Sequence, residues 1–254
     1  DGEVKYTNVE VSEHVVNLVV CRNVFDETSE RVYFGETALK EFIFDMTTIN
    51  QGRNIVVAHN GSGYDSRLVF EAVTKSGVPF SMKMITTGTR FMSLKAGNAL
   101  FKDSLLFLPA SLATLAKSFD LTMRKGIFPH LFNSEENYDY NGMLPSKEFF
   151  DLTFFAKTVK DINEFNSWYE TRKLQPWNFK EELIQYCKDD VKILAQIVVK
   201  FHDICMNKFN SSPWNSSTGP GFAHKTILET LSKPLPIEPV SRREVVQEMA
   251  KDTH

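Results

Sequence analysis

The sequence predicts an α/β fold of about 210 residues followed by an extended tail. Runs of apolar or β-branched residues, such as 14–21 and 54–59, alternate with segments whose apolar residues recur at helical spacing, such as 37–46 and 65–75. The chain has 254 residues, of which 42% are hydrophobic and 24% charged. Such a composition is typical of a globular protein, and the alternation indicates a sheet flanked by helices.

In the first part of the chain, three apolar or β-branched segments are expected to form strands: 14–21, 31–34 and 54–59. Two segments with one apolar face are expected to form helices: 37–46 and 65–75. The run 54–59 is continuously apolar, which predicts a central strand buried on both faces. Short strands joined by Gly88 and Gly97 are expected to follow.

In the second part, the elements expected are a helix over 111–119, an ordered loop over 125–140, a weaker helical pair over 145–168 and a long helix from about 180 past 201. Asn178 is the expected N-cap of that long helix. A segment rich in Ser, Pro and Gly begins at Ser211 and is interpreted as a linker. We therefore expect one domain over 1–210, and a linker over 211–254 that begins the connection to a further domain.

The bulk properties exclude several classes of protein. A net charge of -3 argues against a strongly basic nucleic-acid coat protein but not against a nuclease, whose metal site must itself be acidic. Cys21, Cys187 and Cys205 have no metal-ligand spacing and suit a reducing intracellular compartment, with cytoplasm, nucleus and mitochondrion all open. The sequence has no apolar run of membrane-spanning length and no signal-peptide pattern. The first residue is not Met, which indicates a processed chain or an excised piece.

Four carboxylates lie at the edges of apolar elements: Asp1, Glu3, Asp65 and Asp190. Asp1 and Glu3 alternate along an extended segment and so share a face, while Asp190 follows Tyr186 by one helical turn. Each alone is explained by a cap, a turn or a surface charge. Together they favour a site for hard cations, which oxygen ligands prefer. The neighbouring Asp189 is turned about 100° away and is interpreted as solvent-facing.

Five motifs resemble those of the 3′→5′ proofreading exonuclease domain of family-B DNA polymerases. Asn60-x-x-x-Tyr64-Asp65 resembles the second motif, Tyr186-x-x-x-Asp190 the third, and Asp1-x-Glu3 fits the first. Ser104-Leu105 lies in a segment similar to the Ser/Thr-Leu-x-x-hydrophobic motif. Lys125-Gly-Ile-Phe128 is similar to a Lys-x-x-hydrophobic motif best known in the protein-primed branch of bacteriophages, adenoviruses and linear plasmids. The motifs are in the family's order and cover roughly residues 1–210.

The resemblance implies an RNase-H-like fold of the tyrosine-type, four-carboxylate (DEDDy) class, a mixed sheet flanked by helices. It also implies two Mg²⁺ or Mn²⁺ ions, held by Asp1, Glu3, Asp65 and Asp190, that hydrolyse a phosphodiester. Tyr186 is expected to orient the attacking water and Lys125 to steady the phosphate or its carboxylate neighbours. The activity implied is removal of mispaired nucleotides from a DNA 3′ end.

The partners implied are a single-stranded DNA 3′ end, the polymerase domain of the parent chain and, in the protein-primed branch, a terminal protein primer; no membrane is expected. DNA contacts are expected from four residues: Asn60, Tyr64, Ser104 and Leu105. His59 is interpreted as a buried, hydrogen-bonded histidine, and His130 receives no role.

Two alternatives remain open. The first motif could instead align with Asn8-Val-Glu10, which replaces a catalytic carboxylate by an amide and favours a catalytically inactive nucleic-acid-binding or scaffold module. An exoribonuclease of the same superfamily is the other, since no residue visibly reads a 2′-hydroxyl.

Overall fold

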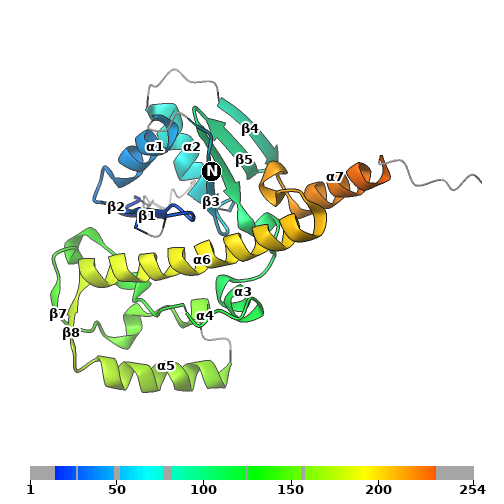
Figure 1. Ribbon diagram of the computed structural model, residues 1–254. Coiled ribbons are helices and arrows are strands. Elements are labelled where there is room, and N and C mark those ends of the chain that lie inside the picture. Colours follow the sequence, from blue (N-terminus) through cyan, green and yellow to red (C-terminus); the bar gives the residue numbers. More distant parts are fainter. Residues whose placement is uncertain are drawn as a thin grey trace, which may run out of the picture. The chain divides into compact units, whose positions relative to one another are not determined.

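The chain forms two compact units, residues 1–201 and 202–254. The computed structural model describes residues 15–26, 28–48, 52–63, 65–76, 82–123, 125–155 and 158–232 (Figure 1). The predictions for Asp1, Glu3, Tyr64 and the alternative Asn8-Val-Glu10 lie outside the described residues.

A four-stranded mixed sheet organises the first unit. Its strand order is β3 (Asn54–Ala58), β6 (Ala99–Asp103), β5 (Arg90–Ala96) and β4 (Met82–Thr87). β3 and β6 are parallel, whereas the other two pairs are antiparallel. Gly88 and Gly97 have φ of 57° and 52°, the left-handed conformation that tight hairpin turns require. The predicted α/β class and the two glycine joints are confirmed.

The prediction that 54–59 is buried on both faces is wrong, because no residue of β3 is fully buried. Among the described strands, β3 pairs with β6 alone, and Ile55 is 40% exposed. A run of apolar residues indicates hydrophobicity but does not show how completely neighbouring elements cover the two faces of the strand.

Two helices cover the sheet beside a small hairpin. α1 (Ala38–Thr48) contacts α2 (Asp65–Lys75), β3 and the antiparallel hairpin of β1 (Leu18–Arg22) and β2 (Glu30–Phe34), while α2 contacts β5 (Figure 1). The core between these elements is formed by six buried residues: Tyr33, Ala38, Phe42, Ile43, Val73 and Ala96. Both helices therefore bury one apolar face against the sheet and the hairpin, as the helical spacing of their apolar residues predicts.

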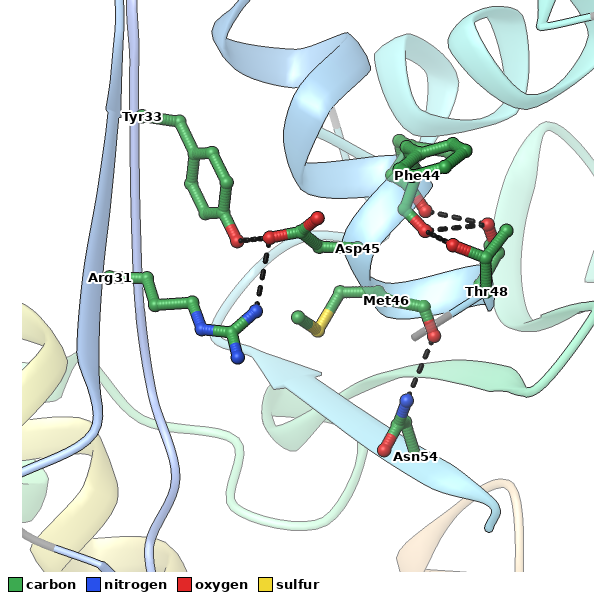
Figure 2. Close-up of polar contacts among 9 residues, drawn as sticks. Arg31, Tyr33, Phe44, Asp45, Met46, Thr48 and Asn54 are labelled. Atoms are coloured by element: carbon green, nitrogen blue, oxygen red, sulfur yellow. Dashed lines mark hydrogen bonds and ion pairs between the residues drawn. The ribbon is translucent and has the colours of Figure 1, made fainter. Parts of the chain in front are cut away.

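Polar contacts at the end of α1 connect it to two strands (Figure 2). The Tyr33 hydroxyl of β2 donates to Asp45 Oδ2 at 2.6 Å, and Arg31 Nη1 donates to the same oxygen at 3.0 Å. The Asn54 side-chain amide of β3 donates to the carbonyl of Met46 at 2.9 Å. These bonds satisfy a partly buried carboxylate and one of the last helix carbonyls, which would otherwise lack partners.

A second core is almost entirely aromatic and supports the long helix α6 (Phe179–Phe209). It joins α6 to α5 (Val159–Arg172), to the small sheet of β7 (Asn141–Met143) and β8 (Pro176–Asn178), and to the loop over 125–140. Its buried members are Phe128, Phe132, Leu144, Phe150, Phe165, Tyr169, Trp177, Phe179 and Leu183.

Short helices complete this part of the first unit: η1 (Ser104–Leu106), α3 (Leu112–Ser118), η2 (His130–Phe132), η3 (Glu135–Asn137), η4 (Lys147–Phe149) and α4 (Leu152–Phe155). The backbone N–H of Glu181 donates to Asn178 Oδ1 at 3.0 Å, so the predicted N-cap of α6 is confirmed.

The second unit contains a helix that the sequence analysis did not expect. η5 (Pro213–Asn215) and α7 (Gly219–Leu231) lie in the segment predicted as a linker. The hydroxyl of Thr218 accepts the N–H of Gly221 at 3.1 Å, and a proline follows in the first turn, a favourable helix start. Composition alone suggested a linker because Ser, Thr, Gly and Pro serve both in loops and at helix N-termini. Among the described residues, no helix combines the length and apolar character needed to cross a bilayer.

Candidate active site

The turn between β3 and α2 places two of the predicted site residues. Asn60 adopts φ of 65°, a left-handed conformation that asparagine tolerates better than most residues. A Cβ on Gly61 would lie 3.1 Å from the Cβ of Ala58, so a side chain there would crowd the strand end. The backbone N–H of Ser66 donates to the carbonyl of Gly61 at 2.8 Å. The turn therefore closes tightly and starts α2 at Asp65.

Asp65 is the first residue of α2 and is accessible to solvent. Partial burial and the nearby negative charge of Asp103 raise the pKa of its carboxyl group. Two carboxylates in proximity repel each other, and a bound cation would relieve that repulsion. This end of the sheet is thus chemically suited to a positive ligand.

A second group of side chains forms where the loop over 125–140 meets α6. Lys125 Nζ lies 3.4 Å from Asp190 Oδ2 and 5.7 Å from the centre of the Tyr186 ring. A Cβ on Gly126 would lie 3.3 Å from Cδ2 of Tyr186, so the glycine after the lysine allows the loop backbone to approach the ring. The structure therefore brings together three predicted site residues from two segments far apart in the sequence.

The carboxylate of Asp190 is only partly satisfied. Its Oδ1 atom is buried and has no hydrogen-bond partner within the described residues. Burial raises the pKa of Asp190, with a contribution from the charge of Asp189, whereas Lys125 opposes the shift. A buried carboxylate oxygen without a donor is costly, and coordination of a hard cation would satisfy it.

The donor set fits a divalent cation in this respect. However, nowhere in the described ranges do three His, Cys, Asp or Glu side chains come together as a metal site. Two of the four predicted ligands, Asp1 and Glu3, lie outside those ranges.

Charges within this group tune one another. Burial acts to lower the pKa of Lys125, but its electrostatic and hydrogen-bonding interactions with Tyr186 and Asp190 outweigh that effect, and the net shift is upward. Burial, followed by the charge of Asp190, raises the pKa of Tyr186, while Lys125 acts against that shift. At neutral pH the group therefore contains a cationic lysine beside a neutral tyrosine hydroxyl, which can both donate and accept a hydrogen bond.

His130 belongs to this group, although the sequence pattern predicts no role for it. Its Nε2 lies 3.4 Å from the Tyr186 hydroxyl, and the two rings meet edge to face with centroids 5.4 Å apart. Burial and the charge of Lys125 lower the pKa of His130. A histidine in a loop without periodicity gives no spacing signal, so only its distance from the Lys125 motif could have indicated the contact.

Ser104 and Leu105 follow β6. The Ser104 side chain is fully buried, and its hydroxyl lies 2.9 Å from Nδ1 of His59 and 3.0 Å from the carbonyl of Ala58. Nε2 of His59 lies 3.0 Å from the carbonyl of Ala110. Because a carbonyl only accepts, Nε2 of His59 donates to Ala110, and the Ser104 hydroxyl donates its single proton to Ala58. His59 is hydrogen-bonded as predicted but half-buried rather than fully buried. Ser104 faces the interior, whereas Leu105 is half-buried.

Charges from both groups of side chains affect the pKa of His59. Burial lowers its pKa and Lys125 adds to that effect, while the bond to Ala110 and the charge of Asp103 act in the opposite direction. Asp103 at the end of β6 and Lys125 beside α6 therefore both shift the pKa of this one ring. Asp189 accepts a hydrogen bond from Gln185 Nε2 at 2.8 Å along the same helix and acts on Asp190 only through its charge.

The family described as DNA polymerase type B, organellar and viral, matches residues 45–250. The chain belongs to this family. Its relatives include the probable DNA polymerases of Ascobolus immersus and Neurospora intermedia, each 29% identical, over 69% and 61% of this chain. The probable DNA polymerase of Agaricus bitorquis is 24% identical over 73% of this chain. The predicted membership of family-B DNA polymerases is confirmed.

The chain spans only a small share of these relatives: 15% of the Ascobolus protein, 17% of the Neurospora protein and 24% of the Agaricus protein. Among solved structures, it is similar to Phi29 DNA polymerase complexed with single-stranded DNA, with a TM-score of 0.48 and 15% identity. That match covers 83% of this chain and 31% of the Phi29 chain.

Proposed function

We propose that this chain is a 3′→5′ exodeoxyribonuclease module that removes mispaired nucleotides from the single-stranded 3′ end of DNA. The observation that carries the proposal is the buried Oδ1 of Asp190, which has no hydrogen-bond partner among the described residues and belongs to a side chain beside Lys125 and Tyr186. A divalent cation would satisfy a carboxylate oxygen in that condition, and the lysine and tyrosine supply groups that can bind a phosphate and a water. Membership of a DNA polymerase family makes a DNA 3′ end the natural substrate.

Asp65 and Asp190, together with Asp1 and Glu3, would hold two divalent cations, Mg²⁺ or Mn²⁺. Bound there, the cations supply Lewis-acid activation of water and stabilise charge on the departing oxygen. The Tyr186 hydroxyl orients the water by accepting or donating a hydrogen bond, and Nε2 of His130 lies 3.4 Å from that hydroxyl. The Lys125 ammonium group, already paired with Asp190, offers its remaining N–H donors to the scissile phosphate.

The reaction is a hydrolysis in which the oxygen of water bonds to phosphorus and the bond from phosphorus to the 3′ oxygen breaks. A nucleoside 5′-monophosphate leaves, and the 3′ oxygen takes up a proton. Asn60, Tyr64 and Leu105 are the groups available to hold the last bases, by hydrogen bonding and by stacking worth about 1–3 kcal/mol per base. Ser104 supports this surface from within through His59 rather than by touching DNA.

Two partners follow from the proposal. The rest of a polymerase chain would deliver the mispaired 3′ end, and a terminal protein would serve as primer if the parent belongs to the protein-primed branch. Neither is needed for hydrolysis of a free single strand, so the activity is expected of this chain by itself.

The test is an incubation of 5′-labelled single-stranded DNA, and separately of RNA, with the chain and Mg²⁺ or Mn²⁺. We expect stepwise shortening of the DNA from its 3′ end, abolished by EDTA and by Asp65→Ala or Asp190→Ala. Asp189→Ala is the matched control, because it removes a carboxylate from the adjacent helical position, where the side chain is bonded to Gln185. That variant should degrade DNA at the wild-type rate.

Other outcomes would assign other functions. Binding of DNA without shortening would favour the inactive nucleic-acid-binding or scaffold module. Shortening of RNA alone would favour an exoribonuclease. Loss of activity in Asp189→Ala to the same extent as in Asp190→Ala would remove the assignment of the metal ligands.

A further inference from the structure

The carboxylate of Asp103 makes three hydrogen bonds that the proposed chemistry does not use. Oδ1 accepts the backbone N–H groups of Asn60 and Leu105, both at 2.8 Å, and Oδ2 accepts the N–H of Ser62 at 2.9 Å. The residue is only 2% exposed. All three donors are backbone groups, and they belong to two separate turns.

Strand register explains how one side chain reaches both turns. β3 and β6 run parallel with Ala58 opposite Asp103, so the two strands end together at the same edge of the sheet. The turn that follows β3 contains Asn60 and Ser62, and the short helix η1 that follows β6 begins at Ser104. Asp103, at the end of its strand, is also the N-cap of η1.

The bonds to Asp103 offset two local costs. Asn60 has φ of 65°, a conformation that is unfavourable for a residue with a side chain. The N–H groups of Asn60 and Ser62 lie in partly or fully buried surroundings and would otherwise be desolvated without a partner. Bonds from N–H groups to a carboxylate are roughly twice as strong as those between neutral groups, so this one acceptor can hold both turns.

We propose that Asp103 is a positioning residue that joins the turn over 60–63 to the turn over 104–106 and so holds Asn60, Leu105 and the start of α2 at Asp65 as one unit. The importance of this unit for DNA rests on the proposed function. The connection itself does not, because it is a property of the protein without DNA or metal.

Two substitutions separate the bonds. Asp103→Asn keeps one oxygen, which retains the bonds from Asn60 and Leu105, but places an NH₂ group opposite the N–H of Ser62. Asp103→Ala removes all three acceptor contacts. Asp26→Asn is the matched control, since Asp26 also accepts from a nearby backbone N–H, that of Thr28 at 2.9 Å, in an exposed turn outside the site.

The first measurement is amide hydrogen exchange, resolved by residue, in the absence of metal and DNA. We expect exchange to rise about tenfold or more at Ser62 in Asp103→Asn, and also at Asn60 and Leu105 in Asp103→Ala. Amides of α6 should keep their wild-type protection, which shows that the variants are folded. Unchanged exchange at Ser62 in a folded Asp103→Asn protein, or an equal rise in Asp26→Asn, would overturn the proposal.

The second measurement is single-stranded DNA binding without metal, followed by exonuclease kinetics. Asp103→Ala should weaken DNA binding and lower kcat by at least about tenfold, with Asp103→Asn intermediate and Asp26→Asn unchanged. Wild-type kcat and DNA affinity in a folded Asp103→Ala protein would contradict the positioning role while leaving the exonuclease intact. A wild-type chain without exonuclease activity would instead refute the proposed function, and the exchange data would still decide the role of Asp103.

Discussion

Asp190 shows how a single residue can indicate a site. Its carboxylate lies one helical turn after Tyr186 and within reach of Lys125, and one of its oxygens is buried without a hydrogen-bond partner in the described part of the chain. The sequence indicated the helical pairing because a spacing of four places two side chains on the same face. It could not indicate His130, whose contact with Tyr186 depends on how a loop without periodicity folds back onto α6.

Tyr186→Phe tests the role of the hydroxyl. The variant keeps the ring, which packs 5.4 Å from the ring of Phe128, and loses only the oxygen that faces His130. We expect the exonuclease rate to fall by about 10²-fold, since water would no longer be oriented, while the free energy of unfolding changes by less than about 1 kcal/mol. Rates on labelled DNA and a denaturant titration check both. An unchanged rate would remove Tyr186 from the mechanism.

His59 should make stability depend on pH. Its folded-state pKa is lowered, so the unfolded chain, with a histidine pKa near 6.5, binds the proton more readily. The native state therefore loses stability as pH falls below about 6.5. His59→Gln removes this titration. The difference in free energy of unfolding between wild type and variant, measured by denaturant titration, should shrink from pH 7 to pH 5. A constant or growing difference would be inconsistent with a neutral, half-buried His59.

At the level of elements, hydrophobic periodicity predicted α1, α2, α3 and α6 well because each buries one apolar face. It failed for α7, whose capping Thr218 and following proline resemble a linker in composition. It also missed that no residue of β3 is fully buried. Both failures concern information that is not local: which neighbour an element finds, and whether a turn residue starts a helix.

The aromatic core beneath α6 gives a prediction on stability. Phe179, the first residue of α6, is fully buried and contacts the rings of Phe128, Phe132, Tyr138 and Trp177. Phe179→Ala should lower the free energy of unfolding by about 3–5 kcal/mol, because it creates a cavity in a packed core.

The matched control for that prediction is Phe25→Ala, which removes the same ring from a position that is 90% exposed. It should change stability by less than about 0.5 kcal/mol. Denaturant titrations of both variants make the comparison. Equal effects would show that the core beneath α6 is not packed as described.

At the scale of the molecule, the α/β class, the family and the grouping of Lys125, Tyr186 and Asp190 followed from the sequence. The order of the five motifs predicted the family, because an ordered set of motifs is far more specific than a single motif. The joining of two turns by Asp103 was not predicted. A carboxylate at a strand end is common, and its partners are set by the parallel register of β3 and β6, which only the fold defines.

The proposed function requires that Asp65 and Asp190 bind divalent cations together. Mn²⁺ binding by calorimetry tests it directly, with Asp65→Asn, Asp190→Asn, the double variant and Asp189→Asn as control. We expect each single variant to weaken Mn²⁺ binding at least about tenfold, the double variant to lose less than the sum of the two because the residues share ions, and Asp189→Asn to bind as wild type. Wild-type Mn²⁺ affinity in Asp190→Asn would contradict the proposed metal site, because Asp190 carries the buried oxygen that lacks a partner among the residues described.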